Sequence, residues 1–191
     1  MRGGRVFSFG SGPTAMAALA WGLAEATVFF IVPDVLLSLV AQRAGLRAAV
    51  VATGFAVLGA CVGGLIMWQL GRAYPDTMIA ALDLVPAISA EMVERARSSL
   101  AAGPLDALLA GAFSGIPYKV FAGTAASAGI SAPSLLLLTI PARAARFLVA
   151  VAVTVLVDRG ILRGLTELAR RRILVGFWLV FYAVYFFVMP H

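Results

Sequence analysis

Long apolar runs separated by short polar stretches dominate the chain. When the charged positions are marked, five apolar blocks remain, at residues 14–32, 46–70, 105–130, 134–157 and 173–189. Most of them approach or exceed the ~20 residues with which a helix crosses ~30 Å of hydrocarbon. The pattern therefore predicts an all-α integral membrane protein that forms a single membrane domain over residues 1–191.

Two of these stretches are interrupted by proline. Pro33 stands in "IVPD" and Pro117 in "SGIPYK", close behind Gly115. Proline lacks the backbone donor of a helix and disfavours helical geometry in the residue before it. We therefore expect structural breaks at residues 32–34 and 115–117.

Arginine is concentrated in three stretches: the N-terminus, the turn around Arg43 and Arg47, and residues 158–172. The connector at residues 71–104 instead balances its basic residues with acidic ones. Cytoplasmic loops carry an excess of Lys and Arg, so the three basic stretches are predicted to be cytoplasmic and the connector to lie outside.

This assignment requires residues 14–42 and 105–131 each to return to the side from which they entered. Residues 46–70, 134–157 and 173–189 then span fully, which leaves the C-terminus outside. The predicted architecture is an inverted repeat with two opposed re-entrant helical hairpins and about three transmembrane helices. The alternative is a kinked but fully spanning helix in one or both interrupted segments.

Composition agrees with a membrane protein and excludes several other classes. Apolar residues make up 62% of the chain and charged residues 13%, against about 45–50% and 25% in soluble domains. The net charge of +6 resides in short loops rather than in a basic domain, so nucleic acid is not an expected partner. Cys61 is the only cysteine, which excludes an intramolecular disulfide. Arginine and alanine richness is typical of a bacterial genome of high GC content.

Five ionisable residues fall inside the apolar blocks or at their breaks, and they divide by sign between the two halves. Glu25 and Asp34 lie in the first half, whereas Lys119, Arg143 and Arg146 lie in the second. Each would cost roughly 2.5–3.5 kcal/mol at the centre of a membrane helix, so each needs a partner or water. If the two breaks meet near the midplane, Asp34 is expected to lie close to Lys119.

Two interpretations of this cluster remain open. The charges either lock the two halves together or form a site for a charged substrate, with the cations binding phosphate and the acids handling protons or a cationic group. Arg143 and Arg146, three residues apart on one helix face, suit bidentate phosphate contacts, although snorkelling toward headgroups is an alternative. Glu25 is a candidate proton carrier, and Tyr118 either donates a hydrogen bond at the site or packs.

Other chemistry has little support in the sequence. It contains no nucleophile–base pair, no metal-ligating cluster and no phosphate-cradling loop, and its single histidine is the last residue, His191. We therefore expect no enzymatic activity, no metal and no cofactor, with protons as a candidate coupling ion.

The connector contains a helical pattern of its own. Ile88, Met92, Ala96 and Leu100 recur every four residues and charged residues take the other face, which predicts a short amphipathic helix. It either lies at the membrane interface or caps the bundle as an ordinary surface helix.

Three stretches together resemble a known family. "EATVFFIVPDVLL", "GACVGGLIMWQLGR" and "SGIPYKVFAGTAASAGIS" resemble the bacterial DedA family and, more widely, the VTT or SNARE-associated Golgi protein superfamily, in particular the short branch with an Ile-Pro-Tyr-Lys motif. The likeness extends from about Trp21 to Val157.

The resemblance implies a bacterial inner-membrane protein with opposed re-entrant helices that moves lipids, either polyprenyl phosphates or phospholipids, with proton coupling proposed for some members. It implies that Glu25 and Asp34 correspond to the family's membrane-embedded acids and Lys119 to the basic residue after its second re-entrant proline. The chain departs from the family at the first tip, where Val-Pro-Asp replaces Pro-Gly-Asp or Pro-Gly-Glu. At the second tip, Phe113 stands near the place of an arginine.

The predicted function is thus that of a flippase-like or scramblase-like lipid transporter whose partners are membrane lipids. The alternatives are a proton-driven transporter of a small solute or ion and a membrane scaffold without transport. The oligomeric state stays open, with a homo-oligomer as one candidate.

Overall fold

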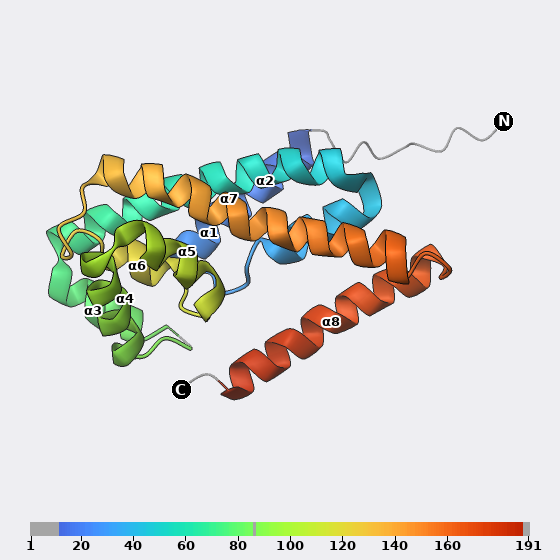
Figure 1. Cartoon of the computed structure of the whole chain (residues 1–191). Coiled ribbons are helices and arrows are strands. Elements are labelled where there is room, and N and C mark those ends of the chain that lie inside the picture. Colours follow the sequence, from blue (N-terminus) through green and yellow to red (C-terminus); the bar gives the residue numbers. More distant parts are fainter. Residues whose placement is uncertain (1–11, 86, 189–191) are drawn as a thin grey trace.

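The computed structural model describes residues 12–85 and 87–188, and all of the regular secondary structure in these residues is helical (Figure 1). The N-terminal arginines and His191 of the topology prediction lie outside the described residues. The helices follow one another as α1 (Gly12–Thr27), α2 (Asp34–Ala73), α3 (Pro75–Asp83), α4 (Ala90–Ala102), α5 (Pro104–Ser114), α6 (Tyr118–Thr124), α7 (Ala132–Leu156), a π-helical turn (Val157–Ile161) and α8 (Glu167–Val188).

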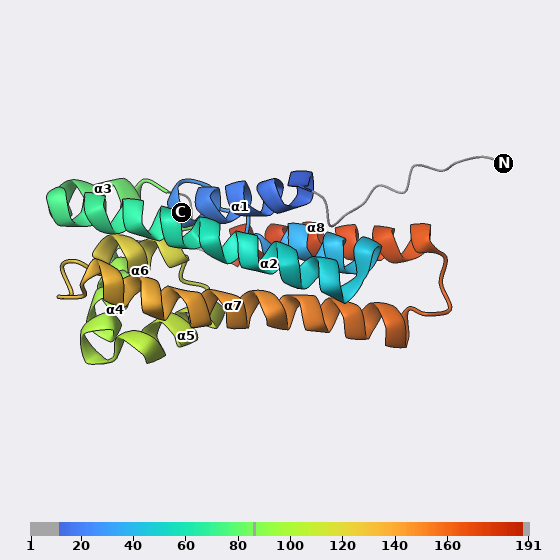
Figure 2. The ribbon, with the colours of Figure 1, turned by 90° about the horizontal axis from the view of Figure 1, so that it is seen from above.

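Among the described residues, three helices are long and apolar enough to cross a membrane: Asp34–Ala73, Ala132–Ile161 and Glu167–Val188. This confirms the prediction of an all-α chain and gives it three candidate membrane spans. In both ribbon views α2 and α7 run along the length of the molecule (Figure 2), and in Figure 1 α8 turns back at the far end of α7 and diverges from it.

The first break, which we define as residues 28–33, begins earlier than the sequence predicts. Helix α1 ends at Thr27, and Pro33 stands at the start of α2 rather than at the end of α1. The physical reason is that proline is favoured at a helix start, where its missing N–H would have no helical partner.

A second bend separates the beginning of α2 from its long remainder. Gly45 interrupts the helix with a φ of 82° and ψ of 179°, a geometry that glycine adopts without steric cost. The bend lies at the predicted boundary between the segment 14–42 and the span 46–70, so α2 combines a short leg with a long apolar helix.

The second break, which we define as residues 115–117, lies where the sequence predicts it. Gly115 ends α5 in the left-handed conformation with φ 86°, and Pro117 precedes α6. Glycine is the usual residue at such a helix end because it has no Cβ to clash. In Figure 1 the turn between α5 and α6 lies beside the first break.

The connector folds into α3 and α4, and α3 is an element that the sequence analysis did not anticipate. Helix α4 carries the predicted stripe, and Met92, Ala96 and Leu100 are buried. Because protein covers these side chains, α4 caps the bundle rather than presenting an apolar face to the interface. Ser89 accepts a hydrogen bond from the N–H of Met92 at 3.3 Å and caps the helix.

Helix α8 begins at Glu167, inside the stretch 158–172 that was predicted to be a loop. Asp158 in the π-helical turn links its start to the first half. Its carboxylate accepts hydrogen bonds from Arg170 at 2.8 Å and from Gln42 at 3.2 Å. The base of α8 is thus fixed to the end of the short leg of α2.

Glycines permit close contact between α1 and α2. A Cβ atom on Gly22 would overlap the carbonyl oxygen of Ala56, and one on Gly59 would overlap that of Leu19. Small residues let membrane helices approach in this way, so the glycines of α2 serve close packing against α1.

We expect Gly59→Ala to lower the free energy of unfolding in detergent by about 1–3 kcal/mol, because the added methyl group must displace backbone atoms of α1. Gly54→Ala is the matched control, since a Cβ there would have nothing within 4 Å. It is expected to be neutral or to stabilise by up to about 1 kcal/mol. Thermal unfolding of the two variants checks the prediction, which equal midpoints would contradict.

Candidate functional site

The five ionisable residues predicted from the sequence gather in one region. Glu25 lies near the end of α1, Asp34 at the start of α2, Lys119 in α6, and Arg143 and Arg146 in α7. Four of the five are buried, with exposed fractions of 3% for Glu25, 4% for Asp34, 1% for Lys119 and 3% for Arg143. Arg143 is therefore not a snorkelling residue.

Two ion pairs join the acids of the first half to the arginines of α7. Arg143 donates a hydrogen bond to Glu25, and both side chains are almost completely buried. Arg146 contacts Asp34 through Nε and Nη2, each 3.0 Å from Oδ2. Its Nη1 donates to the carbonyl oxygen of Ala112 in α5.

The expected approach of Asp34 to Lys119 is not the pairing observed. Asp34 pairs with Arg146, and Lys119 donates to the carbonyl oxygen of Phe29 at 2.7 Å. The reason is geometric, because α7 supplies cations directly beside both acids while α6 faces the unwound backbone of the first break. Among the described residues Lys119 forms no ion pair.

The first break is an unwound segment whose backbone bonds to side chains. Trp21 donates to the carbonyl oxygen of Ile31 at 2.8 Å, and the N–H of Val32 donates to the hydroxyl of Tyr182 at 2.8 Å. Lys119 supplies a third bond, to the carbonyl oxygen of Phe29. The three side chains belong to three different helices, α1, α6 and α8. Backbone groups away from water need such partners.

Tyr118 is enclosed on several sides. Its hydroxyl lies 2.7 Å from the hydroxyl of Thr139, and a Cβ on Gly64 would overlap it. The guanidinium of Arg143 stands over the ring of Tyr118 at 5.1 Å and over that of Phe147 at 4.7 Å. Tyr118 therefore packs and hydrogen-bonds at once, and its ring contributes a cation–π contact to Arg143.

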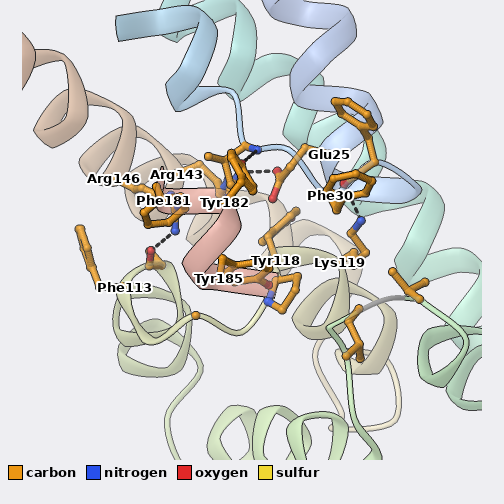
Figure 3. A pocket seen from close by; sticks show the side chains of 17 residues that line it. Glu25, Phe30, Phe113, Tyr118, Lys119, Arg143, Arg146, Phe181, Tyr182 and Tyr185 are labelled. Carbon is orange, nitrogen blue, oxygen red and sulfur yellow. Dashed lines mark hydrogen bonds and ion pairs between the residues drawn. The ribbon is translucent and has the colours of Figure 1, made fainter. Parts of the chain in front are cut away.

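A cavity of about 380 Å³ lies between the two breaks, α7 and α8 (Figure 3). Its walls carry four of the five ionisable residues, namely Glu25, Lys119, Arg143 and Arg146, together with Tyr118, Gly115 and Pro117. Its volume lies within the range of about 300–1,000 Å³ that is usual for small-molecule sites. Asp34 does not line the cavity, but it pairs with Arg146, which does.

Helix α8 contributes aromatic residues that the sequence analysis did not single out. Phe181, Tyr182 and Tyr185 line the cavity, and Phe113 of α5 borders it near Arg146 (Figure 3). The aromatic run "FWLVFYAVYFF" was visible in the sequence. Nothing in the order of residues, however, indicates that this helix folds back onto the first break.

Charge and hydrogen bonding in the cluster are not fully balanced. Three cations face two carboxylates, which leaves one positive charge without a countercharge inside the cluster. The Nε of Arg143 and the Oδ1 of Asp34 are buried without a hydrogen-bond partner among the described residues. Buried polar atoms of this kind are the places where water or a ligand is expected.

A scan against protein-family models finds no match, and neither the search of curated proteins nor that of solved structures finds one.

Proposed function

We propose that the chain is a flippase-like or scramblase-like transporter that moves lipids with an anionic phosphate headgroup across a bacterial inner membrane. The observation that carries this proposal is the buried ammonium of Lys119, which has no described carboxylate partner and borders the cavity of about 380 Å³. A phosphate group would supply the missing negative charge, and the unpartnered Nε of Arg143 is a further donor for it.

The arrangement of the breaks supports a site with access from both sides. In each half, a helix stops at an unwound segment, and a proline precedes the helix that continues. We infer that these are two re-entrant hairpins of an inverted repeat, with residues 14–42 entering from the cytoplasmic face and residues 105–131 from the outer face. Transport sites near the midplane at such repeat interfaces are a recurrent design. The resemblance to the DedA family points to the same arrangement.

The exterior of the molecule supports a lipid as the substrate. All of the residues of α8 from Glu167 to Val188 are described, and none is buried, although the helix forms one wall of the cavity. A headgroup in the cavity would therefore lie one helix away from hydrocarbon. Its chains would stay in the bilayer while the headgroup crosses.

Glu25 is the residue through which protons would act. It lines the cavity and pairs with Arg143, so protonation would remove its charge and release the arginine for a phosphate. Buried acids in membrane proteins commonly serve in proton relays.

Reconstitution tests the proposed function. Liposomes containing the purified chain and a trace of headgroup-labelled phosphatidylglycerol are treated with a membrane-impermeant reductant that bleaches the label. We expect bleaching of label from both leaflets, whereas empty liposomes should lose only the outer-leaflet label. A second preparation carries trapped inorganic phosphate. Phosphate release without lipid movement would favour a solute transporter, and absence of both would favour a scaffold.

A further inference from the structure

A second, apolar space lies directly beside the cationic cavity. It is a groove of about 300 Å³ between α8 and the first half of the chain. One wall comes from the first break and the short leg of α2, the other from α8. Its apolar lining includes Phe30, Val35, Leu39, Val175, Leu179 and Phe186.

The polar atoms that border this groove are already engaged. The indole N–H of Trp178 donates to the hydroxyl of Ser38 at 2.9 Å, and the hydroxyl of Tyr182 accepts from the N–H of Val32 at 2.8 Å. The groove therefore presents hydrocarbon and aromatic surface, with little left to bind a polar ligand. Such a surface favours an apolar occupant.

The groove and the cavity adjoin one another. Phe30 and Tyr182 line both spaces, so each of these side chains borders the cationic site and the apolar groove. Phe30 also contacts Phe186 of α8, with ring centroids 5.2 Å apart. A molecule with a phosphate at one end and hydrocarbon at the other matches this pair of spaces.

We propose that the groove holds one hydrocarbon chain of a lipid whose anionic headgroup lies in the cationic cavity. This inference rests on the proposed function, because it assigns the second part of the same substrate. Headgroup and chain are then recognised separately: the cations of α6 and α7 bind the phosphate, and the walls formed by α8 and the first break bind the chain.

The test fills the groove and compares it with an equivalent change elsewhere on the same helix. Val175→Trp places an indole in the groove. Val180→Trp is the matched control, since Val180 lines neither space and is 64% exposed. Val35→Phe fills the groove from the opposite wall and provides a second variant should Val175→Trp unfold. Thermal unfolding in detergent establishes that each variant is folded.

Two readouts are measured in liposomes: movement of headgroup-labelled long-chain phosphatidylglycerol, and photolabelling by phosphatidylglycerol with a diazirine in one chain. In the unsubstituted protein we expect label on residues 28–39 and on the facing side of α8. Val175→Trp should reduce that label and slow lipid movement about tenfold, the loss expected if a chain gives up about two buried methylene groups. Val180→Trp should change neither readout.

The outcomes separate this inference from the proposed function. If lipid moves and the Val175 and Val180 variants are photolabelled equally, the groove does not hold the chain, and the proposed transport function is unaffected. Groove labelling that Val175→Trp abolishes, in a protein that moves no lipid, would support the groove as a lipid-binding site and overturn transport. Absence of both movement and groove labelling would overturn both.

Discussion

Replacement of Glu25 by glutamine is expected to lower the free energy of unfolding by about 3–5 kcal/mol, because it leaves the guanidinium of Arg143 buried without a countercharge. The ion pair between these residues has side chains only 4% and 5% exposed. The rings of Tyr118 and Phe147 border the same guanidinium, and no other carboxylate pairs with it among the described residues. Unfolding by denaturant in detergent micelles measures the change.

Glu91→Gln is the matched control for this experiment. Glu91 pairs with Arg95 at 3.8 Å on the surface of α4, where the two side chains are largely exposed. Exposed pairs contribute about 0–1 kcal/mol, so this variant should be almost as stable as the unsubstituted protein. If the two glutamine variants lose the same stability, the buried pair does not have the importance that we assign to it.

A double variant determines whether the unpaired charge of Arg143 or the change in packing causes the loss of stability. Combining Glu25→Gln with Arg143→Met removes both charges and keeps an apolar side chain against the two rings. Removal of both partners of a buried pair is often neutral, whereas removal of one is not. The double variant should therefore recover much of the stability lost by Glu25→Gln.

Lys119→Met is expected to have the opposite profile, with a loss of lipid transport of about 10–100-fold and with little change in stability. The transport loss corresponds to about 1.5–3 kcal/mol, the usual contribution of a hydrogen bond to a charged group. Stability should stay about the same, because relief from burying an ammonium without a carboxylate partner offsets the loss of about 1–3 kcal/mol from its hydrogen bond to the carbonyl oxygen of Phe29. The bleaching assay and thermal unfolding measure the two quantities on the same preparation.

Lys119→Arg and Arg97→Met complete the comparison. The first keeps the positive charge and should retain part of the transport. The second removes a charge from the surface of α4, where Arg97 pairs with Glu94 at 3.1 Å, and should leave transport intact. Full transport by Lys119→Met would refute the assignment of this residue to the phosphate. A loss of stability with intact transport would favour the scaffold.

The breaks could be located from the sequence because proline and glycine act locally. Pro117 and Gly115 mark the second break within a residue, since a missing donor and a left-handed backbone have fixed consequences. Pro33 indicated the first break but not its beginning at residue 28. Where a helix ends ahead of a proline depends on which partners its backbone finds in the folded chain.

The membership of the cluster was predictable, but its pairing was not. Charges in apolar segments must find partners, so Glu25 and Arg143 could be assigned to a common site from sequence alone. Which acid meets which cation depends on the rotation of α7 and on the depth of each break. The same limit explains why Tyr182 was missed, since its role follows entirely from the way α8 folds back.

The unwound segment at residues 28–33 has a consequence for motion. Its backbone bonds to Trp21, Lys119 and Tyr182, from three separate helices, and each bond lost without replacement would cost about 1–3 kcal/mol. We therefore expect α6 and α8 to shift together with the first break, so that these bonds are kept. Either helix could shift alone only if water or a headgroup replaced the hydrogen bond that it loses. A phosphate oxygen can accept from Lys119 or from the N–H of Val32, so the arriving substrate would itself lower the barrier to opening.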